Sequence, residues 1–229
     1  MHRAIRGYIP LLWKCIQPRQ NPFFCLQKKE LSQYTIIPLN WLNFAFGYTI
    51  NVIMKDKIID DAIRRVYDFP KKGICFYDIT GILVNPTVFN YCINKMIDFC
   101  KTLSIDAIAA IEARGFIFAS PIAQKLNLPL ILVRKKGKLP GEVYQASYSL
   151  EYGKATIEVH KNDIKEGQNI LVLDDLIATG GTLNATKDII EKGGAKVTAF
   201  LGVIGLPFLN YKKVLKDKPI HTLIEFENE

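Results

Sequence analysis

The chain has 229 residues, of which 49% are hydrophobic and 23% charged, so its composition is that of a globular protein with a sizeable core and excludes a disordered chain. The net charge of +8 would by itself be compatible with nucleic-acid binding. However, residues 1–53 hold six of the 30 Lys and Arg residues and one of the 22 acidic residues, so they carry +5 and residues 54–229 carry +3. The larger part is only mildly basic, so its net charge gives little support to a nucleic-acid partner.

The sequence lacks the signals of a membrane span, a zinc site or a disulfide framework. No run of 18 apolar residues occurs, so we expect no membrane partner. The three histidines show no ligand spacing. The cysteines are odd in number and include no Cys-x-x-Cys pair: Cys15, Cys25, Cys75, Cys92 and Cys100. This pattern predicts reduced thiols and a cytoplasmic protein.

Residues 1–53 differ from the rest of the chain because they are basic, aromatic and nearly free of acids, without a persistent hydrophobic period. The low acid content is compatible with an organelle-targeting segment, although Arg and Ser are sparse. A secretory signal fits less well, because no long apolar run precedes a small-residue cleavage site. We favour a third interpretation, in which Met54 is the natural start, residues 1–53 are upstream sequence or a dispensable extension, and residues 54–229 form the functional domain.

From Met54 onward, the hydrophobic pattern predicts alternating helices and strands. The first elements expected are a helix over residues 58–66, a loop with a short strand over 69–80, a helix opened by Asn85-Pro86, a strand over 105–111 and a helix from about 116. Later elements are a strand over 130–133, paired strands over 147–150 and 156–159, a strand over 170–173, a helix ended by Gly193-Gly194, and strands over 197–203 and 222–226. This order predicts an α/β fold with a mostly parallel sheet covered on both faces.

Residues 170–182 read ILVLDDLIATGGT and hold the most specific chemical pattern of the chain. Four apolar residues typical of a buried parallel strand precede Asp174 and Asp175, and a loop of small and hydroxyl residues then leads into a helical pattern. Gly180 and Gly181 allow the backbone to approach an anion, and N–H groups at a helix start favour negative charge. Since the carboxylates suit sugar hydroxyls, a developing cation or a metal ion, the segment predicts a sugar-phosphate site.

Two further segments place cations just after expected strands. Arg114 and Gly115 follow the strand over 105–111, and residues 134–138, RKKGK, follow the strand over 130–133. In a sheet of this kind ligands bind beyond the carboxyl ends of the strands, so we expect these cations on the same side as the acidic pair. An arginine guanidinium can donate two parallel hydrogen bonds to the oxygens of a pyrophosphate, and this favours a binding role for Arg114. For Lys136 a solvated turn is the better interpretation.

Segment 170–182 resembles the phosphoribosyl diphosphate (PRPP) motif of the type I phosphoribosyltransferases. Residues 137–141 (GKLPG) and 146–153 (ASYSLEYG) narrow the resemblance to the adenine phosphoribosyltransferases. The other matching segments are Phe69-Pro70, residues 76–80 (FYDIT) and residues 112–116 (EARGF). The resemblance extends from about residue 56 to 225. It implies the type I phosphoribosyltransferase fold, a mostly parallel central sheet flanked by helices, with a small N-terminal hood and a flexible catalytic loop.

The resemblance also implies a role for each matching residue. Asp174 and Asp175 would hold the ribose hydroxyls, and Glu151 would assist proton transfer at the purine. The 5-phosphate would be bound by Ala178, Thr179, Gly180, Gly181 and Thr182. The pyrophosphate would be surrounded by Arg114, Arg134, Lys135 and Lys138. Adenine would be bound by the ring of Phe76 and by backbone groups of Cys75 and Tyr77.

The implied reaction is displacement of pyrophosphate from C1 of PRPP by N9 of adenine, which gives AMP in purine salvage. As pyrophosphate departs the ribose becomes oxocarbenium-like, and nearby carboxylates stabilise its positive charge. Mg²⁺ travels with the pyrophosphate and neutralises it, so we expect no residue of the chain to bind the metal directly. The resemblance further implies a homodimer.

Two positions depart from the family pattern. Tyr77 stands where many relatives have Arg, and Gly205 replaces a common acid. Two rival functions are compatible with parts of the sequence. The first is transfer to hypoxanthine, guanine or xanthine, which the Ser-Leu-Glu-Tyr loop disfavours. The second is a PRPP-binding transcription regulator, which is disfavoured because residues 1–53 show no helix-turn-helix pattern. We therefore predict an adenine-specific enzyme that does not bind nucleic acid.

Overall fold

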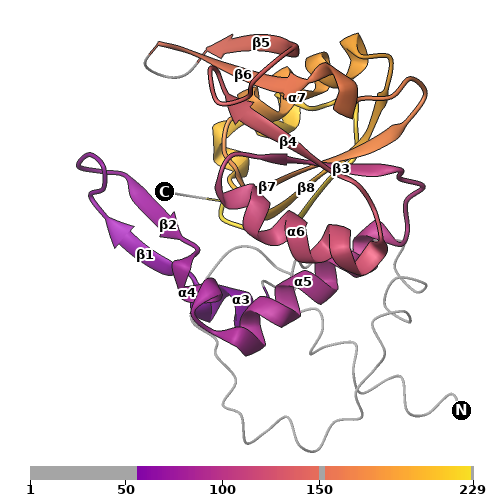
Figure 1. The fold of residues 1–229 in the computed structure, drawn as a ribbon. Helices are drawn as coiled ribbons and strands as arrows, with labels where there is room; N and C mark the ends of the chain where they lie inside the picture. Colours follow the sequence, from indigo (N-terminus) through magenta and orange to yellow (C-terminus); the bar gives the residue numbers. More distant parts are fainter. Residues whose placement is uncertain (1–55, 150–152, 228–229) are drawn as a thin grey trace, which may run out of the picture. The chain divides into compact units, whose positions relative to one another are not determined.

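The computed structural model describes residues 56–149 and 153–227 (Figure 1). The chain divides into two units, Met1–Ile53 and Met54–Glu229, and all described residues belong to the second. The expected extension over residues 1–53 therefore lies outside the described residues. Within the described part, none of the helices is both long enough and apolar enough to cross a membrane.

The described part begins with a small hood. Helix α3 covers Lys57–Ala62, strands β1 (Arg64–Tyr67) and β2 (Cys75–Asp78) form an antiparallel pair, and the short helix α4 (Thr80–Leu83) follows. The prediction of one helix over residues 58–66 is therefore wrong in its second half. Val66, expected on the apolar helix face, is instead paired with Phe76 in the hairpin and is 42% exposed.

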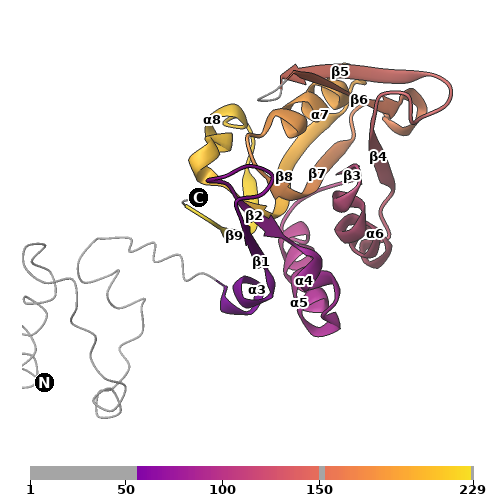
Figure 2. The same ribbon diagram turned by 90° about the vertical axis from the view of Figure 1, so that its left-hand side faces the viewer.

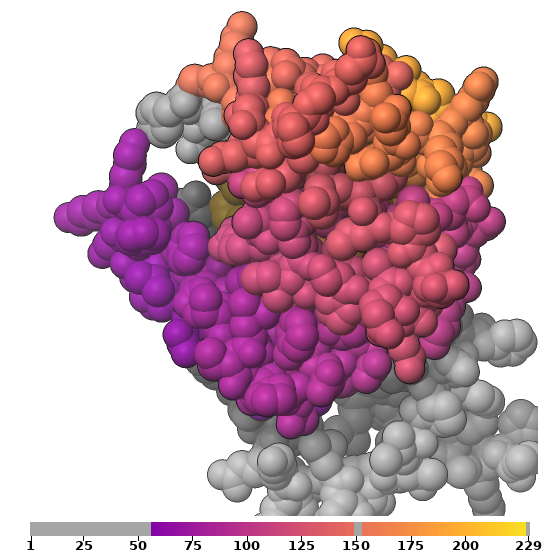
Figure 3. Space-filling model, in the orientation of Figure 1, coloured from indigo at the N-terminus to yellow at the C-terminus, as the bar shows by residue number. Residues whose placement is uncertain are grey.

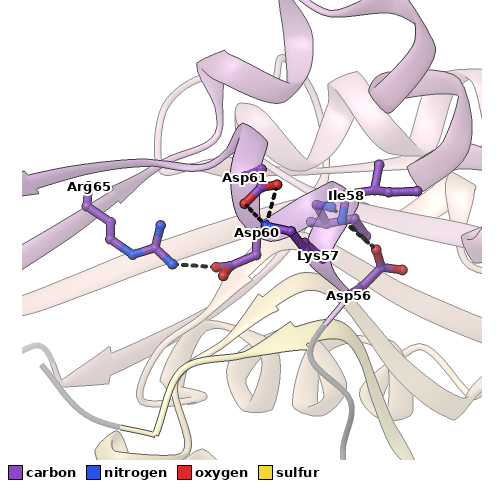
Figure 4. A network of polar contacts seen from close by, with 7 residues as sticks. Asp56, Lys57, Ile58, Asp60, Asp61 and Arg65 are labelled. Carbon is purple, nitrogen blue, oxygen red and sulfur yellow. Dashed lines mark hydrogen bonds and ion pairs between the residues drawn. The ribbon is translucent and has the colours of Figure 1, made fainter. Parts of the chain in front are cut away.

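The early end of α3 has a local cause. Asp56 caps the helix by accepting hydrogen bonds from its first turn, and Ile63 is already extended at its end, with φ −80° and ψ 122°. After this point Val66 belongs to a β-branched and aromatic stretch that favours a strand, and pairing with β2 outweighs the helical spacing. Figure 4 shows Arg65 of β1 reaching back to the Asp60 carboxylate, so an ion pair joins the helix to the hairpin.

Helix α5 (Pro86–Cys100) begins where the sequence predicted. Asn85 Oδ1 accepts hydrogen bonds from the N–H groups of Thr87 and Val88 at 3.2 and 3.3 Å, which satisfies two donors that lack helical partners. The buried face of the helix consists of Val88, Cys92, Ile93, Met96, Ile97 and Cys100. Burial raises the pKa of the Cys92 thiol to about 12 and that of Cys100 to about 11, so both are inert core residues.

Seven strands form the central sheet, in the spatial order β5-β6-β4-β3-β7-β8-β9. Their bounds are Ala107–Ile111 (β3), Leu130–Lys135 (β4), Val143–Ser149 (β5), Lys154–His160 (β6), Asn169–Ile177 (β7), Lys196–Gly205 (β8) and Ile220–Glu225 (β9). Strands β4, β3, β7, β8 and β9 are parallel, whereas β6 runs antiparallel to β4 and β5. The predicted mostly parallel sheet is confirmed, and the strands predicted over 147–150 and 156–159 are paired as β5 and β6.

Helices cover both faces of the sheet (Figures 1 and 2). Helices α5 and α6 (Arg114–Leu126) share a core with Leu171 and Leu173 of β7. Helix α7 (Gly181–Lys192) shares a second core with Ile170 and Val172, the alternate residues of the same strand. The remaining elements are the short helix α8 (Tyr211–Val214) and two 3₁₀ turns, Lys161–Asp163 and Pro207–Leu209. Strand β7 is thus fixed between two cores. On the outside of the molecule, Figure 3 shows a hollow beside the indigo hood.

The capping hydrogen bonds of α5 give a stability prediction. Asn85→Ala removes the acceptor of the Thr87 and Val88 N–H groups and should lower the free energy of unfolding by about 1 kcal/mol, measured by urea denaturation. Asn90→Ala, at an exposed position inside the same helix, is the matched control and should be neutral or slightly stabilising. Equal destabilisation by the two substitutions would show that the cap contributes nothing special.

Candidate active site

Strand β7 carries both carboxylates of the predicted ribose site. Asp174 pairs in register with Gly202 of β8, and pairing continues through Leu176 and Ile177. The sequence placed the end of the strand at residue 173, before the acids, and this boundary is wrong. The strand is longer because Leu176 and Ile177 find partners in Ile204 and Gly205. The acidic pair therefore sits on a rigid central strand and not on a loop.

The first turn of α6 lies against the acidic pair. Arg114 Nε is 3.1 Å from Asp175 Oδ2, and Asp175 is 3% exposed. Asp174 Oδ1 accepts a hydrogen bond from the Asp175 N–H at 2.8 Å. A Cβ at Gly115 would lie 3.0 Å from the Leu173 carbonyl oxygen and 3.3 Å from Asp174 Oδ1, so a larger residue would push the helix away. Arg114, predicted to lie in the loop before a helix from about 116, instead begins the helix itself.

The two carboxylates are under electrostatic strain. Burial raises the pKa of Asp174 well above its ordinary range, and the Asp175 charge raises it further. Burial also raises the pKa of Asp175, while the positive charge of Arg114 opposes that rise. Asp175 Oδ2 is fully buried and has no hydrogen-bond partner among the described residues, because its contact with Arg114 is ionic. Positive charge brought by a ligand would relieve this strain, as is common at functional sites.

Residues 178–182 turn from β7 into α7 around Gly180. Its φ of +81° lies in the left-handed region, and a Cβ there would come within 3.1 Å of Leu215 Cγ. No side chain of the described residues caps α7, and the Gly180 carbonyl accepts the first helical hydrogen bond, from Asn184 N–H at 2.9 Å. The N–H groups of residues 181–183 precede it, where helical acceptors are missing, so the turn has the form of an anion cradle.

Two carboxylates hold the basic segment of residues 134–138 at the end of β4, which extends to Lys135 and does not stop at residue 133 as predicted. Glu112 Oε2 accepts hydrogen bonds from Arg134 Nε at 3.3 Å and from the Lys135 N–H at 2.9 Å. Glu158 Oε1 accepts one from the Lys138 N–H at 2.8 Å. The side chains of Lys135 and Lys138 are exposed, whereas Arg134 is paired. The sequence pattern predicted the cations and included Glu112 in the matching segment 112–116 without a role, but no pattern pointed to Glu158.

The three residues predicted to bind adenine lie on β2 of the hood. Phe76 packs edge-on against Phe69, with ring centroids 5.3 Å apart at 78°. Tyr77 is 5% exposed and stacks on Phe226, just after β9, at 4.0 Å and 19°. Adjacent strand residues face opposite sides, so the Tyr77 ring belongs to the core and only its backbone could meet a base stacked on Phe76. Cys75, the third residue, is a free thiol. No sequence pattern pointed to the contact of Phe226 with Tyr77.

The space beside Gly205 is filled by other side chains. A Cβ at this position would lie 2.6 Å from Tyr211 Oη. That hydroxyl donates to Glu225 Oε1 at 2.7 Å, and Lys212 Nζ donates to Glu225 Oε2 at 2.9 Å. Burial acts to raise the pKa of Glu225, but these hydrogen bonds lower it below its ordinary range. An ionised acid therefore stands beside Gly205 on the neighbouring strand, where the two residues are paired in register.

Glu151, the predicted proton-transfer residue, lies outside the described residues together with Leu150 and Tyr152. The strands on either side are described, and Ser149 of β5 is paired with Lys154 of β6. The role of Glu151 stays a prediction.

The raised pKa of Asp174 predicts how stability depends on pH. Because ionisation is less favourable in the folded chain, wild-type stability should fall as pH rises from about 4, the ordinary Asp value, through the raised value. Asp174→Asn removes this titration, so its stability relative to wild type should grow with pH and then level off, as measured by urea unfolding at a series of pH values. Asn90→Ala, at an exposed position on α5, changes no titratable group and should show a constant difference. A stability difference between Asp174→Asn and wild type that shrinks as pH rises would contradict the raised pKa of Asp174.

Residues 83–222 match the family model described as the phosphoribosyl transferase domain. The adenine phosphoribosyltransferase of Treponema denticola is 70% identical over 177 residues, which are 77% of this chain and 93% of that protein. The crystal structure of adenine phosphoribosyltransferase from Thermoanaerobacter pseudethanolicus has a TM-score of 0.71 at 43% identity, covering 73% of this chain and 98% of its own. The enzyme from Saccharomyces cerevisiae, solved with adenine and an iminoalditol bisphosphate, has a TM-score of 0.68 at 35% identity, covering 72% and 96%.

The comparisons agree with the type I phosphoribosyltransferase fold, in which helices flank a mixed central sheet. The resemblance stated from the motifs is confirmed: the chain belongs to the adenine phosphoribosyltransferases, within the phosphoribosyl transferase domain family.

Proposed function

We propose that the chain transfers the 5-phosphoribosyl group of PRPP to N9 of adenine and releases AMP and pyrophosphate. The observation that carries the proposal is the buried acidic pair on β7, which leads directly into an anion cradle at the start of α7. A sugar phosphate needs this combination, because its phosphate is an anion while its ribose becomes cationic in the reaction. The three relatives named above are adenine phosphoribosyltransferases, and the yeast structure holds adenine.

Asp174 and Asp175 are proposed to hold the ribose hydroxyls and to stabilise the oxocarbenium-like ribose. Their raised pKa values mean that negative charge is held there at an energetic cost, which a cationic sugar relieves. The carboxylates therefore bind the transition state better than the neutral ground-state sugar. Because they are fixed on a strand, little reorganisation is needed when charge develops.

The anionic groups of PRPP are assigned to the two sets of donors. The 5-phosphate would accept hydrogen bonds from the turn of residues 178–182 and interact with the N-terminal dipole of α7. The pyrophosphate would meet Arg114, Lys135 and Lys138, with Arg134 contributing if it leaves Glu112. Arg114 then serves both ends of the reaction, because it also pairs with Asp175.

Mg²⁺ is proposed to enter with the pyrophosphate. No group of three or more potential His, Cys, Asp or Glu ligands gathers among the described residues, so a bound ion would be held mainly by oxygen atoms of PRPP. Asp175 Oδ2 is buried without a hydrogen-bond partner among the described residues, and it forms an ion pair with Arg114, so this position favours a cation nearby. Bound Mg²⁺ would supply charge neutralisation of the departing pyrophosphate.

The base is proposed to stack on Phe76, with backbone groups of Cys75 and Tyr77 at its edge. Phe76 is half-buried and is held by the edge-on contact with Phe69. Glu151 is proposed to accept or relay the N9 proton, on a loop that would close over the site and exclude water. We further propose, from the resemblance and from the cysteine pattern, a cytoplasmic homodimer in which residues 54–229 form the catalytic domain.

The direct test is AMP formation by the purified full chain from PRPP and adenine, with hypoxanthine and guanine in parallel and residues 54–229 assayed alongside. We expect activity with adenine alone, in both proteins, and its loss on chelation of Mg²⁺ without unfolding. Equal rates with hypoxanthine or guanine would contradict the proposed specificity for adenine. A folded protein that binds PRPP but transfers to no base would overturn the enzyme proposal.

The acidic pair gives the first activity prediction. Asp175→Asn should lower kcat roughly 100-fold, the usual effect of removing one preorganised electrostatic partner of the transition state. KM for adenine should change little, because the base is bound by other residues. Asp188→Asn, exposed on α7, is the matched control and should retain full activity. Unchanged kcat in Asp175→Asn would remove this carboxylate from the mechanism.

The phosphate turn gives the second activity prediction. Gly180→Ala puts a Cβ at positive φ and within 3.1 Å of Leu215, so the turn must shift and KM for PRPP should rise about tenfold or more. Gly167→Ala is the matched control, since Gly167 has a similar φ of +78° with no atom within 4 Å of the added Cβ. It should lose stability without a change in KM. A similar rise in KM for both variants would contradict phosphate binding at residues 178–182.

A further inference from the structure

One buried carboxylate has no part in the proposed function. Glu158 lies on β6 and is 2% exposed, between the core residues Ile157 and Val159. Its Oε1 accepts hydrogen bonds from the N–H groups of Lys138 and Leu139, both at 2.8 Å. Buried acids are rare unless they are fully hydrogen-bonded, so this side chain requires a structural or functional reason.

The acceptor oxygens of Glu158 are well satisfied. Oε2 accepts a third hydrogen bond, from Gln145 Nε2 at 3.1 Å. Burial acts to raise the pKa of Glu158, but hydrogen bonds from Leu139, Gly137 and Lys138 N–H groups lower it below its ordinary range. The group is therefore an ionised acceptor that holds consecutive N–H groups of one turn.

That turn is the basic segment after β4. Gly137 has a φ of +82°, the Lys136 N–H bonds to the Thr156 carbonyl at 3.0 Å, and the Lys135 N–H bonds to Glu112. The main chain from residue 135 to 139 is thus held at both ends by carboxylates. The N–H groups of Lys138 and Leu139 are already bonded to Glu158. The donors of this turn that remain for an anion are therefore the ammonium groups of its lysine side chains.

We propose that Glu158 is a positioning residue for pyrophosphate binding: it fixes the turn of residues 135–139 so that the exposed Lys138 ammonium meets the leaving group. This inference rests on the proposed function. It assigns the anion contact of this turn to the lysine side chain and not to the main-chain N–H groups of residues 138 and 139. Glu158 acts through Lys138 and touches no substrate.

Two substitutions separate hydrogen bonding from charge. Glu158→Ala removes every acceptor, so KM for PRPP should rise about tenfold or more with KM for adenine unchanged. Glu158→Gln keeps an acceptor for both N–H groups, and its amide can donate to Gln145 after that side chain flips. It should restore most of the PRPP affinity. Glu142→Ala, which removes an 83% exposed carboxylate paired with Lys161, is the matched control and should behave as wild type.

A double-mutant cycle with Lys138→Ala tests whether Glu158 acts through this lysine. If it does, adding Glu158→Ala to Lys138→Ala should change KM for PRPP less than twofold further. Independent, additive effects would show a general loss of stability and overturn the proposal. A parallel rise in KM for adenine and for PRPP would overturn it as well.

Amide hydrogen exchange on the wild-type full chain gives a test that needs no variant to fold. The N–H groups of Lys138 and Leu139 should be protected, although the turn is at the surface and the Lys138 side chain is exposed. Exchange at the unprotected rate would overturn the proposal. Wild-type AMP formation is measured in the same preparation. If it is absent the proposed function fails, whereas activity with unprotected amides makes only the role of Glu158 wrong.

Discussion

The ion pair between Arg114 and the buried Asp175 is the contact on which the rest of the site depends. Two adjacent buried carboxylates on a central strand are unfavourable, because burial raises the pKa of both and the charge of Asp175 raises that of Asp174 further. The scaffold accommodates them by holding β7 between two cores and by bringing the α6 start close, which Gly115 permits. On the other side Gly202 faces Asp174 in the register, and a Cβ there would meet Ile177 at 2.8 Å.

Each part of the site carries the charge opposite to that of the ligand group that it is proposed to bind. The acidic pair serves a ribose that becomes positive, while the cations after β4 and the start of α7 serve phosphates. Behind the cations stand two glutamates that bind main-chain N–H groups and Arg134. These acids reduce the net positive charge of the turn, so they would weaken anion binding if that binding depended on total charge alone. Their presence is understandable if the position of each lysine matters more than the total charge.

The sequence predicted the order of elements, the mostly parallel sheet, the Asn85 cap and the segment that carries the acids, because each depends on local pattern. It failed where tertiary pairing outweighs that pattern: Val66 fits a helical stripe but pairs with Phe76 in a hairpin, and β7 continues past Asp174 because its neighbour β8 does. Glu158 and Phe226 could not be found at all. Their partners lie on other elements. For Glu158, a lone acid between apolar strand residues is equally compatible with an exposed position.

The two departures from the family pattern, Tyr77 and Gly205, are parts of one feature. The Tyr77 ring stacks on Phe226, whose N–H bonds to the Gly205 carbonyl at 3.0 Å, and the Arg65 guanidinium lies 5.2 Å from the centre of the Phe226 ring. The hood is thus joined to the end of the sheet by an aromatic stack at the position where many relatives have Arg. Tyr211 fills the space beside Gly205, and Glu225 supplies an ionised acid there. The proposed recognition of the base by Phe76 and the backbone of β2 would then depend on this stack, which joins β2 to the end of the sheet.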